Sequence, residues 1–342
     1  HPKNAETKGD RPMTAQAPPQ KSDSPETHEI PKREPITGRL ASFLGGLPTW
    51  ILWFFVVVWT IPTLGLFINS FRTRDAQRAS GWWLFWQDSS NGYGGLTLDN
   101  YRDILGSEST GGVANGLLNS MAISVVATII PIAIAAFAAY AFSWIEFKGR
   151  DTLFIFTVAL LAIPTQVALI PLLQMYAGGA HLTLPLIDKT VTVFPDLDLA
   201  GTIPAVWLTH TGFALPFAIF LLHNYISGLP PDLFESARID GADHFTIFRK
   251  IVVPLSVPVL AAFTIFQFLW TWNDYLIALT MIGGNREDLP ATVVVASLAG
   301  EFGLREELLT AGAFIITVVP LVVFFALQRF FVSGITAGSV KG

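Results

Sequence analysis

The sequence predicts an all-α integral membrane protein with six transmembrane helices. Its 342 residues are 51% hydrophobic and 14% charged, whereas about one quarter of an ordinary soluble domain is charged. The mean hydropathy is +0.51, and the chain contains 27 Phe and 10 Trp. A water-soluble globule of this composition would expose large apolar patches and precipitate.

Six apolar stretches carry this prediction, because a bilayer core requires about 20 mostly apolar residues per helix. They cover residues 45–71, 113–145, 153–176, 202–227, 255–282 and 308–332. All six contain proline, which transmembrane helices tolerate where neighbouring helices or water satisfy the freed carbonyl groups. We therefore expect a packed bundle around a pathway rather than a set of simple anchors.

The segments outside these stretches differ in composition. Residues 1–44 are rich in Pro, Lys, Glu, Ser and Thr without an apolar run, which predicts a disordered tail and not a signal peptide. Residues 72–112 are expected to form a long external loop that carries the run Gly81-Trp82-Trp83-Leu84-Phe85-Trp86. These aromatic side chains suit the headgroup level of a bilayer, and a docking surface for an external partner is the alternative. Residues 333–342 are expected to form a short C-terminal tail.

The distribution of Lys and Arg indicates the orientation, because cytoplasmic segments carry an excess of them. The segments that would share a side with the two termini hold 14 such residues, and the opposite segments hold seven. This count places both termini in the cytoplasm. The loops alone give five against seven, so the Lys and Arg residues of the terminal tails carry this orientation.

Several classes of function are excluded by what the sequence lacks. It has no cysteine, which removes disulfides, thiolate metal sites and cysteine nucleophiles. No phosphate-binding P-loop, His-Glu-x-x-His motif or Gly-x-Ser-x-Gly elbow is present. The net charge of −5 argues against a nucleic-acid partner. We expect a non-enzymatic chain without metal or bound cofactor, so a partner or an ion gradient must supply the energy for any active transport.

The most informative segment is residues 229–254, which we call the elbow. Pro230 and Pro231 end the fourth apolar stretch, and Pro231 suits the first turn of a short helix. Asp240-Gly241 predicts a turn in which glycine supplies positive φ. A second short helix is expected from Ala242, before the next apolar stretch opens.

The elbow resembles the Glu-Ala-Ala loop of bacterial ABC importer permeases, and the chain looks like the maltose-type (MalG-like) carbohydrate branch with a MetI-like bundle. The matching elbow residues are Glu235, Ala237, Asp240, Gly241, Ala242, Ile251 and Pro254, with Ser236 in place of the first Ala. The match continues in Asn119-Ser120, in Trp270-Thr271-Trp272-Asn273-Asp274 and in the terminus from Gly334 to Gly342. The Trp-rich external run is similar to that of alpha-glucoside permeases.

The resemblance implies a role for each of these segments. The elbow residues Glu235 to Ala242, with Pro254, would dock as a coupling helix on a cytoplasmic ATPase subunit. The C-terminal residues Gly338, Lys341 and Gly342 would also reach that ATPase, which would bind ATP-Mg. The partners expected are a homologous permease subunit, two ATPase subunits, an extracytoplasmic solute-binding protein, a carbohydrate and membrane lipid. Transport would proceed by alternating access.

Polar and aromatic residues late in the fifth stretch are candidates for the substrate pathway or an outer gate. They are Gln267, Trp270, Trp272, Asn273 and Asp274. Intramembrane carboxylates such as Asp274 usually face protein or a water-filled cavity, although helix packing and an aromatic belt explain the same cluster.

Three other interpretations remain open at this stage. The first is an ABC permease for a non-sugar solute. The second is an ATP-independent carrier or channel, which needs more intramembrane charge than this chain has. The third is a membrane-embedded enzyme, which lacks an acid–base or metal constellation.

Overall fold

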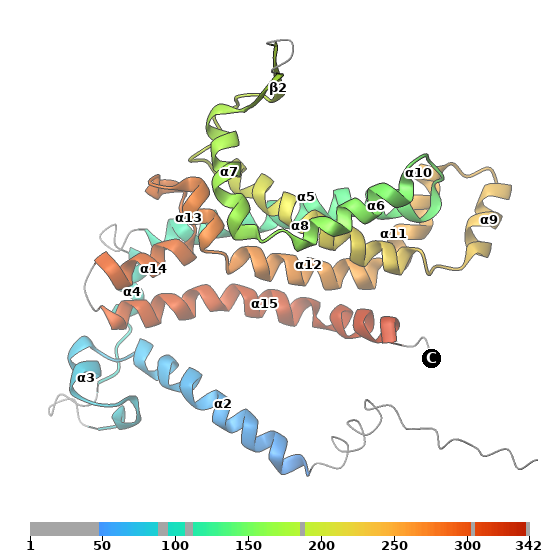
Figure 1. The fold of residues 1–342 in the computed structure, drawn as a ribbon. Helices are drawn as coiled ribbons and strands as arrows, with labels where there is room; N and C mark the ends of the chain where they lie inside the picture. Colours follow the sequence, from blue (N-terminus) through green and yellow to red (C-terminus); the bar gives the residue numbers. More distant parts are fainter. Residues whose placement is uncertain (1–47, 88–94, 107–111, 185–188, 302–304, 340–342) are drawn as a thin grey trace, which may run out of the picture. The chain divides into compact units, whose positions relative to one another are not determined.

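The computed structural model describes residues 48–87, 95–106, 112–184, 189–301 and 305–339. These residues form helices and one two-stranded sheet (Figure 1). The chain divides into two compact units, residues 1–58 and 59–342. In the first unit, the described residues are the opening turns of helix α2 (Thr49–Ser70) and its preceding residue. The predicted disordered tail, residues 1–44, lies outside the described residues.

Four described helices are long and apolar enough to cross a membrane. They are α2, α5 (Val113–Trp144), α8 (Ile203–Ile226) and α15 (Glu306–Ser339). Two bent pairs pass the same test, so the described spans number six if each pair counts once. The first pair is α6 (Arg150–Ala159), extended by η4 (Leu160–Ala162), with α7 (Thr165–Gly178). The second is α10 (His244–Ile247), η5 (Phe248–Val252) and α11 (Val253–Leu255), with α12 (Val257–Trp272).

The two bent pairs show shapes that the predicted spans at residues 153–176 and 255–282 did not specify. The first pair bends by 104° at Ile163, which has extended backbone before Pro164, as residues before proline generally do. The second bends by 73° at Ser256. Its helix α12 ends at Trp272, and a separate helix, α13 (Leu276–Ile282), follows.

Several shorter elements lie where the sequence suggested loops or a tail. The expected external loop contains α3 (Arg74–Ala79), η1 (Trp82–Leu84) and α4 (Asp99–Gly106). Strands β1 (Ala180–Leu184) and β2 (Lys189–Phe194) form an antiparallel hairpin between α7 and α8. Between α13 and α15 lie η6 (Arg286–Asp288) and α14 (Ala291–Glu301). Helix α15 continues through Ser339, so most of the expected tail at residues 333–342 is helical.

The core of the bundle is formed where α5 packs against α8 and α12, and α12 packs against α15 (Figure 1). Small side chains line the α5–α8 contact, among them the buried Ala135, Ala139, Ala214 and Ala218. Small residues allow helix backbones to approach closely in a membrane, where van der Waals packing replaces the hydrophobic effect. Close van der Waals packing of small side chains therefore stabilises the contact between α5 and α8.

The described part of the expected external loop packs against the helices. Trp82 lies so close to Gly65 of α2 that a Cβ atom there would lie 2.7 Å from its Nε1. The fully buried Ile104 of α4 packs in the same way against Gly312 of α15. Trp83 and Trp86 stay exposed. This segment is thus a folded cap with an aromatic outer surface.

Candidate functional site

The elbow, residues 229–254, follows the end of α8 and contains two short helices. Helix α9 (Pro231–Ile239) begins at Pro231, as the sequence predicts. Gly241 has φ +80° and reverses the chain. The second helix, α10, begins at His244 rather than at Ala242, because the Asp243 carboxylate accepts a hydrogen bond from Thr246 N and caps the helix there.

Helix α9 is anchored to the bundle by one buried aromatic side chain. Phe234 is 1% exposed and stacks on Trp144, the last residue of α5, with ring centroids 3.7 Å apart and an interplanar angle of 15°. The indole Nε1 of Trp144 donates a hydrogen bond to the carbonyl oxygen of Ile226 at the end of α8. Trp144 therefore ties α5, α8 and α9 together.

A second set of contacts holds the other half of the elbow. The Tyr140 hydroxyl of α5 lies 2.9 Å from His244 Nδ1, within hydrogen-bond distance. Phe248 of η5 stacks on Phe137 of α5 at 4.3 Å. Hydrogen bonds from Thr246 lower the pKa of Asp243, and the charge of His244 contributes to the same shift. The elbow thus packs on α5 at both ends.

Most of the residues predicted to couple to an ATPase lie on the exposed side of this elbow. Ala237 and Ala242 are half-buried, and the exposed members are Glu235, Ser236, Asp240, Gly241 and Pro254. Large apolar side chains of the elbow are exposed as well: Ile239 is 85% exposed, Phe245 60% and Leu233 40%. An exposed apolar patch of this kind, rimmed by polar groups, marks an interaction surface. We call it the elbow surface.

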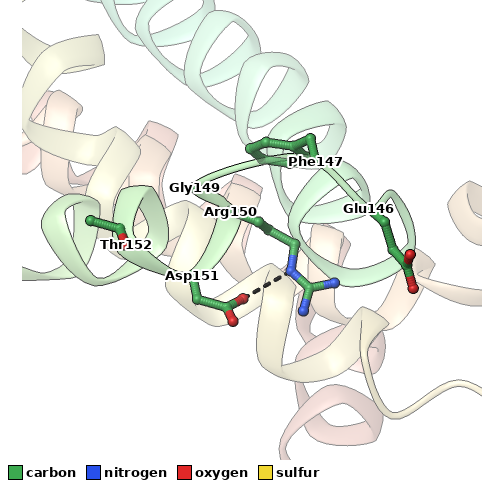
Figure 2. Close-up of a pocket in the computed structure, with 6 residues that line it drawn as sticks. All are labelled: Glu146, Phe147, Gly149, Arg150, Asp151 and Thr152. Atoms are coloured by element: carbon green, nitrogen blue, oxygen red, sulfur yellow. Dashed lines mark hydrogen bonds and ion pairs between the residues drawn. The ribbon is translucent and has the colours of Figure 1, made fainter.

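Two polar clefts lie at the turn between α5 and α6, and one of them reaches the elbow. One, of about 350 Å³, is lined by the turn itself, including Glu146 and Arg150 (Figure 2). Arg150 Nε lies 2.9 Å from Asp151 Oδ1 there. The other cleft, of about 510 Å³, shares Glu146 and Arg150 and extends to Arg238 and His244 of the elbow. The α5–α6 turn therefore borders the elbow surface.

The candidates for a substrate pathway occupy different environments. Gln267 is buried and donates to the carbonyl oxygen of Ala127 in α5. Trp272 is buried as well, and its Nε1 donates to the carbonyl oxygen of Ile316 in α15. Both side chains hold helices together.

The other three pathway candidates are more accessible. Trp270 is half-buried, and Asn273 is exposed. The Asp274 carboxylate accepts hydrogen bonds from the backbone N–H groups of Ile277 and Ala278, at the start of α13. Asp274, one of the predicted pathway residues, therefore caps the first turn of α13.

The predicted C-terminal contacts to the ATPase lie partly within the described residues. Gly338 lies in α15, whereas Lys341 and Gly342 lie outside the described residues. No group of three or more His, Asp or Glu side chains able to hold a metal ion occurs in the part of the chain that the structure describes.

Sequence reasoning missed the partners that anchor the elbow. Trp144 and Tyr140 lie in α5, far from the elbow in sequence, and no local pattern links them to Phe234 or His244. The hairpin was also missed, although the alternation Thr190-Val191-Thr192-Val193 is the period-two pattern of a strand.

The chain belongs to the family of binding-protein-dependent transport system inner membrane components, whose model matches residues 130–337. It is 48% identical over 309 residues to the osmoprotective compounds uptake permease protein GgtD of Synechocystis sp., covering 89% of this chain and 95% of that protein. It is 51% identical over 248 residues to the alpha-glucoside transport system permease protein AglG of Rhizobium meliloti, covering 72% of this chain and 61% of that protein. The trehalose transport system permease protein SugB of Mycobacterium tuberculosis is 32% identical over 250 residues, or 72% of this chain and 83% of that protein.

The fold agrees with this family. A chain in the crystal structure of a bacterial ABC transporter involved in the import of the acidic polysaccharide alginate aligns with a TM-score of 0.61 at 17% identity, covering 86% of this chain and 96% of that chain. The protein is thus a multi-pass membrane permease subunit of the ABC importer type.

Proposed function

We propose that this chain is one of two homologous permease subunits of an ATP-driven carbohydrate importer. The observation that carries the proposal is the elbow surface. It presents Glu235 together with the exposed Ile239 and Phe245 on a helix that is fixed to the bundle through Phe234. A rigid, partly apolar projection suits docking into a cleft of a separate ATPase subunit, which would bind and hydrolyse ATP-Mg while this chain does no catalysis.

The anchoring contacts supply a route for the force. Closure of an ATPase dimer would displace α9, and the Trp144–Phe234 stack would pass that displacement to α5 and α8. The bundle would then alternate between inward- and outward-facing arrangements. In this proposal the elbow and both termini are cytoplasmic, and Gly338, Lys341 and Gly342 approach the ATPase interface.

The proposed cargo is an alpha-glucoside or a related small oligosaccharide. This is supported by the likeness to relatives named for alpha-glucoside and trehalose transport. A solute-binding protein on the outer face would deliver the sugar. Of the predicted pathway residues, we propose the half-buried Trp270 and the exposed Asn273 as the ones that meet it.

A second cargo class has its own support. The relative that shares 48% identity over 89% of this chain is named for osmoprotective compounds rather than for a sugar. A non-sugar osmoprotectant is therefore the alternative substrate, with the same coupling mechanism.

The test of the coupling proposal is the variant Glu235→Lys in the complete transporter, purified with its partners. We expect normal membrane insertion but loss of ATPase association and of uptake, because the charge at the docking surface is reversed. Asp232→Lys is the matched control, since Asp232 is an exposed carboxylate in the first turn of the same helix. Full uptake and full ATPase association in Glu235→Lys would refute the proposal.

A competition assay separates the two cargo classes. Uptake of a radiolabelled alpha-glucoside is measured with an excess of unlabelled trehalose, maltose or a zwitterionic osmoprotectant. Saturable glucoside uptake that the sugars alone reduce supports carbohydrate transport, whereas absence of glucoside uptake in a transporter that takes up the labelled osmoprotectant assigns the alternative.

A further inference from the structure

The break between α12 and α13 is held from several directions at Asp274. Its carboxylate caps α13 through Ala278 N at 2.9 Å and Ile277 N at 3.3 Å. Its backbone carbonyl oxygen accepts a hydrogen bond from the Thr292 hydroxyl of α14 at 2.7 Å. The side chain is 11% exposed, so a charge near the end of a span is enclosed mainly by protein.

A third contact to this carboxylate comes from α8. His210 is 0% exposed, and its Nε2 lies 3.5 Å from Asp274 Oδ2. Neither ring nitrogen of His210 has a hydrogen-bond partner among the described residues. Trp270 covers the imidazole edge-on, with ring centroids 5.1 Å apart.

A buried imidazole without a hydrogen-bond partner is costly, because protein interiors leave few buried polar atoms unsatisfied. Ionisable side chains inside a membrane usually pair with one another and mark functional positions. A carboxylate 3.5 Å from Nε2 is the partner within reach, and an approach by about 0.7 Å would give a charge-assisted hydrogen bond of about 2.8 Å.

We propose that His210 is a positioning residue that acts through Asp274. We call the contact between His210 and Asp274 the latch. In it, the Nε2–H group of His210 donates a hydrogen bond to the Asp274 carboxylate and fixes the start of α13 against α8. The contact joins α8 to the break between α12 and α13, so it holds α13 in position during transport. The transport part of this inference rests on the proposed function, whereas the helix positions can be measured without it.

The position of α13 is tested by spin labels, for which the chain is well suited because it has no cysteine. Labels are attached at Leu208→Cys on α8 and Leu279→Cys on α13, which are both exposed, in the assembled transporter with cysteine-free partner subunits. We expect one narrow distance distribution in the otherwise unchanged chain and a clearly broadened one after His210→Leu. An unchanged distribution in His210→Leu would overturn the latch.

Two amide substitutions distinguish a positioning role from simple packing. The amide nitrogen of His210→Gln falls near the place of Nε2 and can still donate to Asp274, whereas that of His210→Asn falls near Nδ1 and cannot. The latch therefore predicts that Gln preserves the narrow distribution and that Asn behaves like Leu. Because Asn is polar and smaller, it also serves if His210→Leu does not assemble. Equal behaviour of the Gln and Asn variants would overturn the proposal.

Transport provides the second readout. We expect about a tenfold lower maximal uptake rate in His210→Leu and His210→Asn, at an unchanged half-saturating concentration of sugar-loaded binding protein, since a lost hydrogen bond to a charged group has roughly this effect. Thr209→Val is the control, because Thr209 is the buried neighbour on α8 and bonds to Tyr176 and Ala205 instead. A fall in Thr209→Val as large as in His210→Leu would refute the latch. If the unaltered transporter takes up no sugar but His210→Leu still broadens the distance distribution, the latch is supported and the carbohydrate proposal is refuted.

Discussion

The indole ring of Trp144 lies flat against the phenyl ring of Phe234, with centroids 3.7 Å apart. This stack joins the last residue of α5 to the middle of α9, across 90 positions of sequence. Because Phe234 is the buried residue of α9, the orientation of the elbow surface depends on this one contact more than on any other in that helix.

Replacing Phe234 by Ala should release α9 from the bundle. Truncation of a buried Phe costs about 3–5 kcal/mol, and the lost ring stack adds to it. We expect fast hydrogen exchange throughout α9 and weak coupling of uptake to ATP hydrolysis. Phe245→Ala is the comparison, because Phe245 is 60% exposed and should leave exchange in α9 unchanged. Slow exchange in Phe234→Ala would show that another contact holds the helix.

Gly241→Ala should destabilise the elbow through the backbone alone. A Cβ atom at Gly241 meets no atom within 4 Å, but its φ of +80° is disfavoured for alanine, with a cost of about 1 kcal/mol. Gly212 in α8 also has open space around it but lacks positive φ, so Gly212→Ala should instead gain about 0.5–1 kcal/mol of helix stability. Thermal melting of the two variants in detergent gives the comparison, and the same sign for both would contradict the role of φ.

The cap at Asp243 predicts a stabilisation that is present at neutral pH and is lost in acid. Hydrogen bonds from Thr246 lower the pKa of this carboxyl below its ordinary value of 3.8. The stabilisation is therefore complete above pH 3.8 and is lost as the pH falls through the lowered pKa. We expect the difference in melting temperature between the unaltered chain and Asp243→Ala to be constant near neutral pH and to shrink as the pH falls below 3.8. A difference that grows on acidification would show that the carboxylate is not the stabilising form.

Trp272→Phe and Asn273→Ala should separate packing from passage of the substrate. Trp272 is buried and its Nε1 bonds to Ile316, so its substitution should cost roughly 1–3 kcal/mol of stability. In Trp272→Phe, the half-saturating sugar concentration should stay unchanged.

Asn273 is exposed, and its side chain donates a hydrogen bond to the backbone of Leu269 in the preceding turn. Asn273→Ala should therefore leave the melting temperature unchanged and weaken sugar uptake. Unchanged uptake in Asn273→Ala would remove that side chain from the pathway.

Local chemistry determines which features the sequence could predict. Pro231 opens α9 and Gly241 turns the chain because the restriction or freedom of φ belongs to the residue itself. Apolar length likewise predicts the spans. The bends at Ile163 and Ser256 were not predicted, because the neighbouring prolines are tolerated in straight membrane helices as well.

Contacts between distant segments were the other gap. His210 is an isolated polar residue in an apolar helix until the fold brings it to Asp274. Trp144 resembles an interfacial aromatic residue until it meets Phe234. Such pairings depend on the arrangement of the helices, and a single sequence holds no record of it.

The π-helical turn at Phe248–Val252 has a consequence for how this chain tolerates changes in length. A π turn accommodates one residue more than an α turn, so deleting a residue there would restore ordinary helical winding. Such a deletion would leave the flanking turns close to their present phase, whereas deleting a residue from an α-helical turn would rotate the segment before it by about 100°. The turn at Phe248–Val252 is thus the place where this segment can lose one residue with the least change in the direction of the elbow surface.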